Sequence, residues 1–225
     1  MPLSSRSTQP ELLDATDLDP HELRTNLREM AMLNRLPGGV GASLRAVDGL
    51  LDGQTGASVL DIGTGAGDFA RRLAKARPVS VLVADARSEV LEIARRNLRH
   101  TDRVTFLQAD VRALPLGDQS VDVAHASLLL HHLEPSDAVA ALREMRRVAR
   151  NGVVVNDLQR GLLAYVMTAA PVLAFSRGRY TRHDGVLSAR RAYTLPELDD
   201  LASQAGLQPV DRTPRWWPRV TTVYR

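Results

Sequence analysis

The stretch VLDIGTGAGDFA, residues 59–70, carries the pattern that decides the fold. A short apolar run leads into glycines at every second position, and the residues after them have helical spacing. Such glycines allow a positive φ and let a ligand approach the backbone, and the N-terminus of the following helix attracts a negative group. The pattern predicts a strand, a ligand-binding loop and a helix, although a Gly-x-Gly loop alone also suits an ordinary tight turn.

The rest of the chain repeats this alternation. Apolar runs predict strands at residues 58–63, 79–86, 104–111, 120–127 and 152–158, and helical spacing predicts helices at 68–77, 88–100 and 135–150. A capping box of Thr194 and Glu197 starts a further helix, and two short strands follow it at 209–213 and 220–224. We therefore expect an α/β fold: a doubly wound, mostly parallel seven-stranded sheet with helices on both faces and a closing antiparallel hairpin.

Two segments lie outside the alternating pattern. Residues 1–57 are expected to form a loosely docked N-terminal arm followed by lid helices at 21–36 and 41–51. The main domain then covers residues 58–225, with a helical lid insertion at about 160–192. Near the end of the chain, Trp216 and Trp217 are predicted to pack within the closing hairpin.

Composition narrows the chemistry. The 225 residues include no cysteine, which excludes disulfides, thiolate metal sites and cysteine nucleophiles. The formal net charge is +3, but it is uneven, with −5 in residues 1–70 and +5 in residues 160–225. The first residues contain no apolar secretory segment, and no apolar run reaches the roughly 20 residues of a membrane span. These features predict a cytoplasmic protein that does not cross a membrane.

Carboxylates at the predicted strand ends suggest a nucleoside ligand. Asp85 ends the second strand, where it could accept both hydroxyls of a ribose, although it could also cap the next helix, a role that suits Ser88 better. Asp110 ends the third strand and could accept an exocyclic amine such as adenine N6. A dinucleotide loop reads Gly-x-Gly-x-x-Gly, whereas this chain has Asp68 in place of the third glycine. An acid there repels a pyrophosphate but tolerates a zwitterionic amino acid, which favours S-adenosylmethionine over NAD.

With these residues in order, the sequence resembles the class I S-adenosylmethionine-dependent methyltransferases. The matching segments are VLDIGTGAGDFA (59–70), VLVADARSEVLEIARRN (81–97), VTFLQADVRALPLGDQSVDVAHASLLLHHL (104–133) and ALREMRRVARNGVVV (141–155). The resemblance is greatest to the small-molecule branch that includes quinone-biosynthesis enzymes, and it implies a Rossmann-like fold. Residues 150–152 depart from it, because the family has a longer Pro-Gly-Gly turn before the fifth strand.

The resemblance also assigns cofactor contacts. It places the methionine part of S-adenosylmethionine on the loop residues Asp61, Gly63, Thr64, Gly65 and Gly67. It places the ribose on Asp85 and Ala86, the adenine on Asp110 and Val111, and the amino acid and methyl group near Ser127.

Methyl transfer requires alignment of donor and acceptor, and a base when the acceptor must lose a proton. His131, Asp157 and His183 are the candidate catalytic residues. Each has a plainer alternative. At the adjacent histidines, His132 could serve only to hold the loop by a hydrogen bond. Asp157 could form a structural ion pair with Arg160, and His183 could be a solvent-exposed loop residue. No metal site is expected, because the two adjacent histidines have no carboxylates at ligand spacing.

The predicted lid suggests the acceptor. Residues 162–175 are apolar, and arginines near them, of which Arg160 and Arg182 are the candidate substrate ligands, add positive charge. Such a lid suits a hydrophobic small molecule with a phenolate or carboxylate, although the apolar stripe could instead pack on the sheet and the arginines could be solvated.

We therefore expect O-methylation of a small apolar or aromatic acceptor, with C-methylation of a quinone-like or polyketide substrate as the close alternative. Methylation of RNA or protein is less favoured. The fourth strand is not followed by the Asn/Asp-Pro-Pro-Tyr/Phe motif of amino-group methylases, and the cysteine route to pyrimidine C5 is excluded. A cofactor-binding protein without catalysis is a third possibility.

Overall fold

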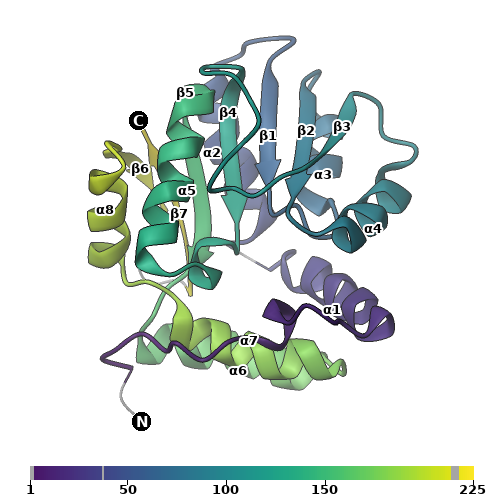
Figure 1. Ribbon diagram of the computed structural model, residues 1–225, viewed down its shortest axis with the longest axis vertical. Coiled ribbons are helices and arrows are strands. Elements are labelled where there is room, and N and C mark those ends of the chain that lie inside the picture. Colours follow the sequence, from purple (N-terminus) through teal and green to yellow (C-terminus); the bar gives the residue numbers. More distant parts are fainter. Residues whose placement is uncertain (1–2, 37, 214–217) are drawn as a thin grey trace.

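The computed structural model describes residues 3–36, 38–213 and 218–225, within which seven strands form one sheet (Figure 1). The strand order is β3-β2-β1-β4-β5-β7-β6. The strands are β1 (Ser58–Ile62), β2 (Ser80–Asp85), β3 (Val104–Gln108), β4 (Val121–Ser127), β5 (Ala149–Leu158), β6 (Pro209–Arg212) and β7 (Arg219–Tyr224).

The sheet has the predicted mixed topology. Strands β1 to β5 are parallel, and β7 pairs antiparallel with both β5 and β6. The central strands are almost continuously apolar because helices cover both faces of a parallel sheet. The direction of winding reverses between β1 and β4, and in such sheets ligands bind at the carboxyl ends of the strands at this point.

Helices cover the two faces unequally (Figure 1). On one face lie α2 (Val40–Leu51), α3 (Asp68–Ala76) and α4 (Ser88–Leu98), whose apolar side chains share a core with β1, β2 and β3. On the other face lie α5 (Pro135–Val148) and α8 (Leu195–Gln204), which bury Leu142 and Met145 against β4 and β5. The capping box of Thr194 and Glu197 at the start of α8 forms as predicted.

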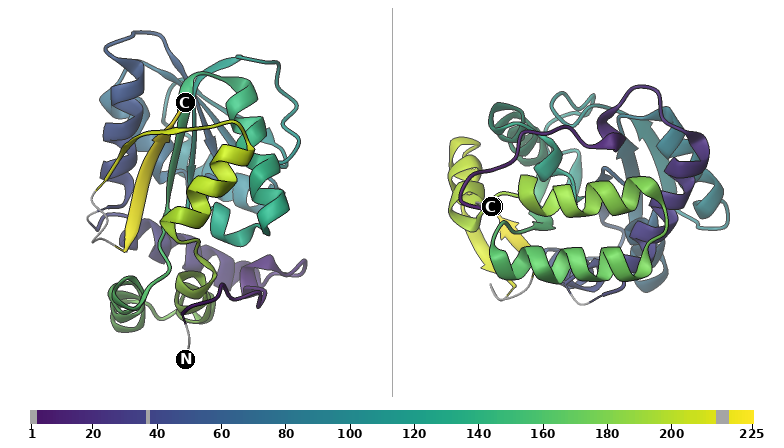
Figure 2. Two further views of the ribbon diagram at one scale, coloured as in Figure 1. Left: turned by 90° about the vertical axis from the view of Figure 1, so that its left-hand side faces the viewer. Right: turned by 90° about the horizontal axis from the view of Figure 1, so that it is seen from below.

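Three helices form a lid below the carboxyl edge of the parallel strands: α1 (Pro20–Leu33), α6 (Leu162–Phe175) and α7 (Arg179–Arg191). Figure 2 shows α6 and α7 side by side, with the N-terminal arm running along α7. The buried carboxylate of Glu29 on α1 accepts the backbone N–H groups of Arg177 (2.7 Å) and Gly178 (3.1 Å), which ties α1 to the start of α7.

The arm itself is firmly held. Arg6 donates to the carbonyl oxygens of His131 (2.9 Å) and Leu133 (2.8 Å) in the short helix η2 (Leu130–His132) and just after it. Asp184 on α7 accepts the N–H groups of Leu12 and Leu13 in η1 (Leu12–Asp14), at 2.9 and 3.0 Å. The prediction of a loosely docked arm is therefore wrong for the residues described.

Other local expectations also differ from the structure. Strand β5 already begins at Ala149, so residues 150–152 belong to a strand and not to a turn. The N-cap of α4 is Arg87, and Ser88 is its first helical residue. Helix α2 packs on the sheet and does not join the lid. Trp216 and Trp217 lie outside the described residues.

Gly67 provides a test of the loop conformation. Its φ is +78°, and a Cβ at this position would lie 2.7 Å from Cδ1 of buried Leu98. Gly67→Ala is therefore expected to destabilise the fold by about 1–2 kcal/mol from backbone strain, with more from displacement of Leu98. Urea unfolding measures this loss. The control is Gly117→Ala, where a Cβ meets nothing within 4 Å; equal losses in the two variants would contradict the argument.

Candidate functional site

A cavity of about 860 Å³ opens at the carboxyl ends of β1, β2 and β4. Its wall combines the β1–α3 loop and the η2 segment with parts of the N-terminal arm, α1, α6 and α7. The volume is within the usual range of about 300–1,000 Å³ for small-molecule sites. The site is thus built between the sheet and the lid.

The glycine loop forms the floor of the cavity. Asp61, Gly63, Thr64 and Gly65 all line it. The buried carboxylate of Asp61 accepts a hydrogen bond from the Thr64 hydroxyl at 2.7 Å, which fixes the start of the loop. Gly63 has a φ of +66°, and a Cβ there would lie 3.1 Å from the Leu129 side chain. Gly67 caps α3 and does not line the cavity.

A chain of buried polar side chains continues from Asp61 beneath the loop. His125 on β4 is fully buried, with Nδ1 at 2.8 Å from Asp61 Oδ1 and Nε2 at 2.9 Å from the hydroxyl of Ser43 on α2. The amide of Asn156 on β5 donates to the same hydroxyl at 2.9 Å. His125 also stacks on Phe69 with ring centroids 3.8 Å apart. Its partners join two strands and a helix, so its role is structural.

Asp85 and Ala86, at the end of β2, also line the cavity. Asp85 Oδ1 accepts the backbone N–H of Arg87 at 3.0 Å. Burial raises the pKa of Asp85 to about 6, aided by the charge of Asp61 and only partly offset by hydrogen bonds from the backbone of Arg87 and Gly65. A partly buried carboxylate with acceptor capacity facing a cavity suits a pair of ligand hydroxyls.

The predicted adenine residues lie further out. Asp110 is half-buried and holds Arg112 in a close ion pair at 2.5 Å, and Arg112 is the member of the pair that lines the cavity. Val111 is buried in the core on the α5 side of the sheet. Ser127, at the end of β4, lines the cavity.

His131 and Asp157 are brought together by the fold, although 26 residues separate them. His131 Nδ1 lies 2.6 Å from Asp157 Oδ1, and both side chains are buried. An ionised carboxylate only accepts, so Nδ1 carries the proton and Nε2 is left as an acceptor. His131 lines the cavity, with Nε2 at 4.0 Å from Glu11 Oε1. Burial opposes ionisation of Asp157, but the charge and hydrogen bond of His131 outweigh it and lower its pKa.

Carboxylates from the arm surround the neighbouring His132. Its Nδ1 lies 3.2 Å from Asp14 Oδ1 and 3.5 Å from Glu11 Oε2. Burial opposes protonation of His132, but the hydrogen bond to Asp14 and the charges of Glu11, Asp14 and Asp157 raise its pKa. Arg191 faces the same carboxylates, with Nη1 at 3.1 Å from Asp14 Oδ2.

Glu11, His131 and His132 also place one potential ligand atom each within 4.8 Å of one another. Two imidazoles and a carboxylate are a donor set that suits zinc or ferrous iron. The expectation of no metal assumed that no carboxylate lies beside the histidines, and the arm supplies two. The positive charge of Arg191 balances these carboxylates in the same place, and they raise the pKa of His132.

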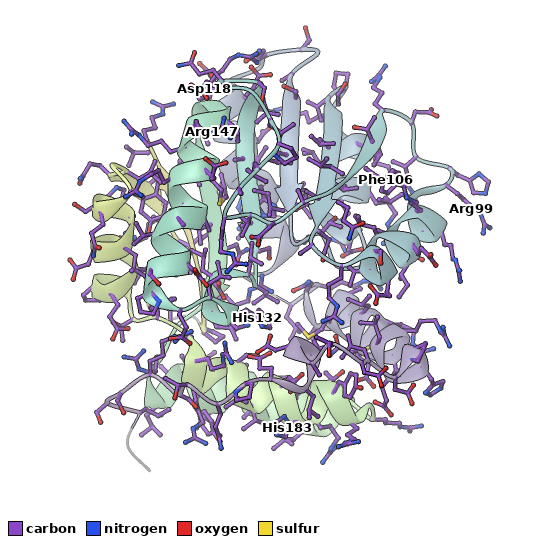
Figure 3. The ribbon with its side chains drawn as sticks, viewed as in Figure 1. Arg99, Phe106, Asp118, His132, Arg147 and His183 are labelled. Atoms are coloured by element: carbon purple, nitrogen blue, oxygen red, sulfur yellow. The ribbon has the colours of Figure 1, made fainter. Side chains whose placement is uncertain are left out.

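Three further predicted residues also lie away from the cavity wall. His183 is half exposed, bonds to Asp184 at 2.7 Å, and sits in the lid below His132 (Figure 3). Arg160 is buried in an ion pair with Glu197 and does not pair with Asp157. Arg182 donates to the carbonyl oxygens of Leu173 and Ser176 at the end of α6.

Sequence reasoning missed several residues of the site. Glu11 and Asp14 lie in an arm that shows no periodicity, and nothing local connects them to η2. Asn156 carried a usable signal, because a polar side chain interrupts the apolar run of β5. Arg219 was one arginine among many, and only the structure reveals that it is buried and lines the cavity.

Comparison with known proteins agrees with this architecture. Residues 59–152 match a family described as a methyltransferase domain. Over 92% of this chain the fold superposes on a SAM-dependent methyltransferase from Aquifex aeolicus, with a TM-score of 0.67, 20% identity and 98% of that chain covered. The chain thus contains a methyltransferase domain and has the fold of a SAM-dependent methyltransferase.

Curated relatives are similar over part of their length. The chain is 34% identical over 130 residues to the ubiquinone/menaquinone biosynthesis C-methyltransferase UbiE of Hahella chejuensis, covering 55% of this chain and 51% of that protein. It is 33% identical over 172 residues to methyltransferase GfsG of Streptomyces halstedii, covering 72% and 57%. The chain thus spans about half the length of these methyltransferases. None of the helices in the described residues has the length and apolarity needed to cross a membrane.

The raised pKa of Asp85 makes stability depend on pH. The pKa of Asp85 rises on folding from 3.8 to about 6, so the native state favours the neutral acid. The contribution of neutral Asp85 to native-state stability is therefore complete below pH 3.8 and is lost as the pH rises through 6. Asp85→Asn should therefore make the ligand-free protein more stable by about 1–3 kcal/mol at pH 7.5, with little gain at pH 4. Urea unfolding at the two pH values measures this difference. A gain independent of pH would contradict the assignment.

Proposed function

We propose that this methyltransferase transfers a methyl group from S-adenosylmethionine to a hydroxyl oxygen of a small, largely apolar molecule. The observation that carries the proposal is the His131–Asp157 pair, in which His131 lines the same cavity as the glycine loop. One cavity thereby holds the elements for nucleoside binding and for proton removal.

The residues at the floor of this cavity fit S-adenosylmethionine. Side chains are missing where a ligand must approach the loop backbone, at Gly63 and Gly65, and both have positive φ. Asp85 provides acceptor atoms at the position suited to the ribose, and the family of the chain uses this cofactor. When bound, S-adenosylmethionine supplies a methyl group on a positively charged sulfur, so the electrophile needs no further activation.

His131 is the proposed base. Its Nδ1–H is held by Asp157, which fixes the ring and leaves Nε2 free to accept a proton from the acceptor hydroxyl. The carboxylate of Glu11, 4.0 Å from Nε2, favours the imidazolium that forms. Asp157 positions the ring and stabilises the same cation from the other side.

The lid supplies the apolar part of the acceptor site. Met167, Pro171 and Val172 of α6 line the cavity, as do Leu23 and Leu27 of α1. Such a wall desolvates a hydrophobic acceptor, and it excludes water from the transferable methyl group.

Carbon methylation is the second candidate. It is favoured by the relative whose name specifies a C-methyltransferase of quinone biosynthesis. Oxygen is preferred here because a phenol, with a pKa near 10, gives its proton to an imidazole more readily than most carbon acids do.

Incubation with S-adenosylmethionine and a panel of phenols, hydroxyquinones and apolar alcohols tests the proposal. We expect a product heavier by one methylene, with a methoxy signal in its NMR spectrum. A methyl group on carbon would replace the O-methyl proposal with the second candidate, and cofactor binding without methylation of any acceptor would contradict both.

His131→Ala and Asp157→Asn test the base. For an acceptor that must be deprotonated, we expect kcat to fall about 10²–10⁴-fold in His131→Ala. Affinity for S-adenosylhomocysteine should hardly change. The matched control is His100→Ala, an exposed histidine at the end of α4. A loss of less than threefold in His131→Ala would show that His131 is not the base.

The cofactor role of Asp85 gives a further prediction. Hydroxyl donors bind an ionised carboxylate better than a neutral acid, so affinity for S-adenosylhomocysteine should rise between pH 5 and pH 7.5. Asp85→Asn should weaken binding at pH 7.5 and flatten this rise, as measured by calorimetry. If the variant kept the same pH dependence, Asp85 would not be the residue that binds the ribose.

A further inference from the structure

Three arginines are buried among the described residues: Arg160, Arg191 and Arg219. A buried cation is costly unless an anion compensates it. Arg160 lies 2.5 Å from Glu197, and Arg191 lies 3.1 Å from Asp14. Arg219 is also buried, but it has no carboxylate within ion-pair distance among the residues described.

The hydrogen bonds that the Arg219 side chain makes to described residues go to neutral groups. Nε donates to the Asn156 amide oxygen at 3.1 Å, Nη1 to the Asn34 amide oxygen at 2.5 Å and Nη2 to the Ser127 hydroxyl at 2.9 Å. A guanidinium has five N–H groups, and these described partners use three of them. One N–H on each terminal nitrogen therefore remains for another acceptor, with the ring of neutral partners fixing the orientation of the group.

Burial lowers the pKa of Arg219 to about 10, a trend that the charge of Asp157 opposes, so the side chain is still a cation at neutral pH. It is also the only one of the three buried arginines that lines the cavity. A positive charge without an ion-pair partner among the described residues thus faces a ligand site.

The sheet fixes where this charge lies. Arg219 is paired with Leu158 at the carboxyl end of β5, and its side chain reaches back to Ser127 at the end of β4. Strand β4 is the direct neighbour of β1, whose end leads into the glycine loop, and adjacent strands are about 4.8 Å apart. The guanidinium therefore lies near the glycine loop after β1. It is on the β4 side of that loop, whereas Asp85 is on the β2 side.

We propose that Arg219 is the anion anchor of the cavity and that its two remaining N–H groups bind a carboxylate. The inference rests on the proposed function for the identity of the ligands. Two ligands of that reaction can supply the carboxylate: the methionine part of the cofactor, or an acidic acceptor.

Calorimetry on the wild-type chain tests the cofactor source first. S-adenosylhomocysteine is compared with S-adenosyl-3-thiopropylamine, the same thioether without the carboxylate. If Arg219 binds the cofactor, the carboxylate should improve affinity about 10–100-fold, the worth of a charge-assisted hydrogen bond. Arg219→Gln should remove this difference by weakening S-adenosylhomocysteine alone, and Arg219→Lys should restore part of it.

The acceptor source is tested in the complex with S-adenosylhomocysteine. Benzoate and benzamide serve as probes of equal shape that differ in charge. If the acceptor supplies the carboxylate, wild-type protein binds benzoate about tenfold or more tighter than benzamide. Arg219→Gln would lose this preference while binding both thioethers as the wild type does.

The control variant is Arg147→Gln, at the end of the molecule away from the lid (Figure 3). It removes an arginine that is paired with Glu144 and Asp118 and should leave every affinity unchanged. The inference is overturned if wild-type protein binds both thioethers equally and both aromatic probes equally, a result that needs no variant to fold. Failure of wild-type protein to bind S-adenosylhomocysteine at all would instead overturn the proposed function.

Discussion

The buried carboxylate of Asp61 is the contact on which the site depends. It holds the glycine loop through Thr64 and the fourth strand through His125, both at hydrogen-bond distances below 3 Å. From His125 the polar chain continues through Ser43 to Asn156, so that β1, β4, β5 and α2 meet at one point. Loss of a single member would leave its buried partners unsatisfied, which costs more than the bond itself contributes. This chain of hydrogen bonds therefore fixes the relative positions of β1, β4 and β5 at the edge of the sheet where the cavity lies.

The second constraint is electrostatic. Charged side chains of the arm and of α7 close the cavity on the side of the lid. The arm brings Glu11 and Asp14 to the two histidines of η2, and Arg191 on α7 balances them. The same arginine donates to the carbonyl oxygens of His131 and His132, so the lid helix, the arm and the two histidines are one connected unit.

The sequence predicted the sheet well, because periodicity and glycines act locally. The strands, their order of winding and the loop that starts at Asp61 follow from alternating apolar runs and βαβ geometry. The site was predicted in part. Asp85 and His131 end predicted strands or follow them, and they line the cavity. His183, Arg160 and Arg182 were chosen from their residue types and their places in or beside the predicted lid, and the fold directs them to Asp184, Glu197 and helix carbonyl groups, respectively.

What escaped prediction depends on contacts between distant segments. Glu11 reaches η2 across more than a hundred residues, and Arg219 reaches Ser127 from the last strand. Such pairings have no periodic signature, and only the packing of the lid and the hairpin onto the sheet creates them.

A crystal structure with S-adenosylhomocysteine bound tests the central claim most directly. We expect the Asp85 carboxylate to accept the ribose hydroxyls and the sulfur to face the part of the cavity that His131 and α6 line. A ribose bound away from Asp85, or a sulfur turned away from His131 toward solvent, would contradict it.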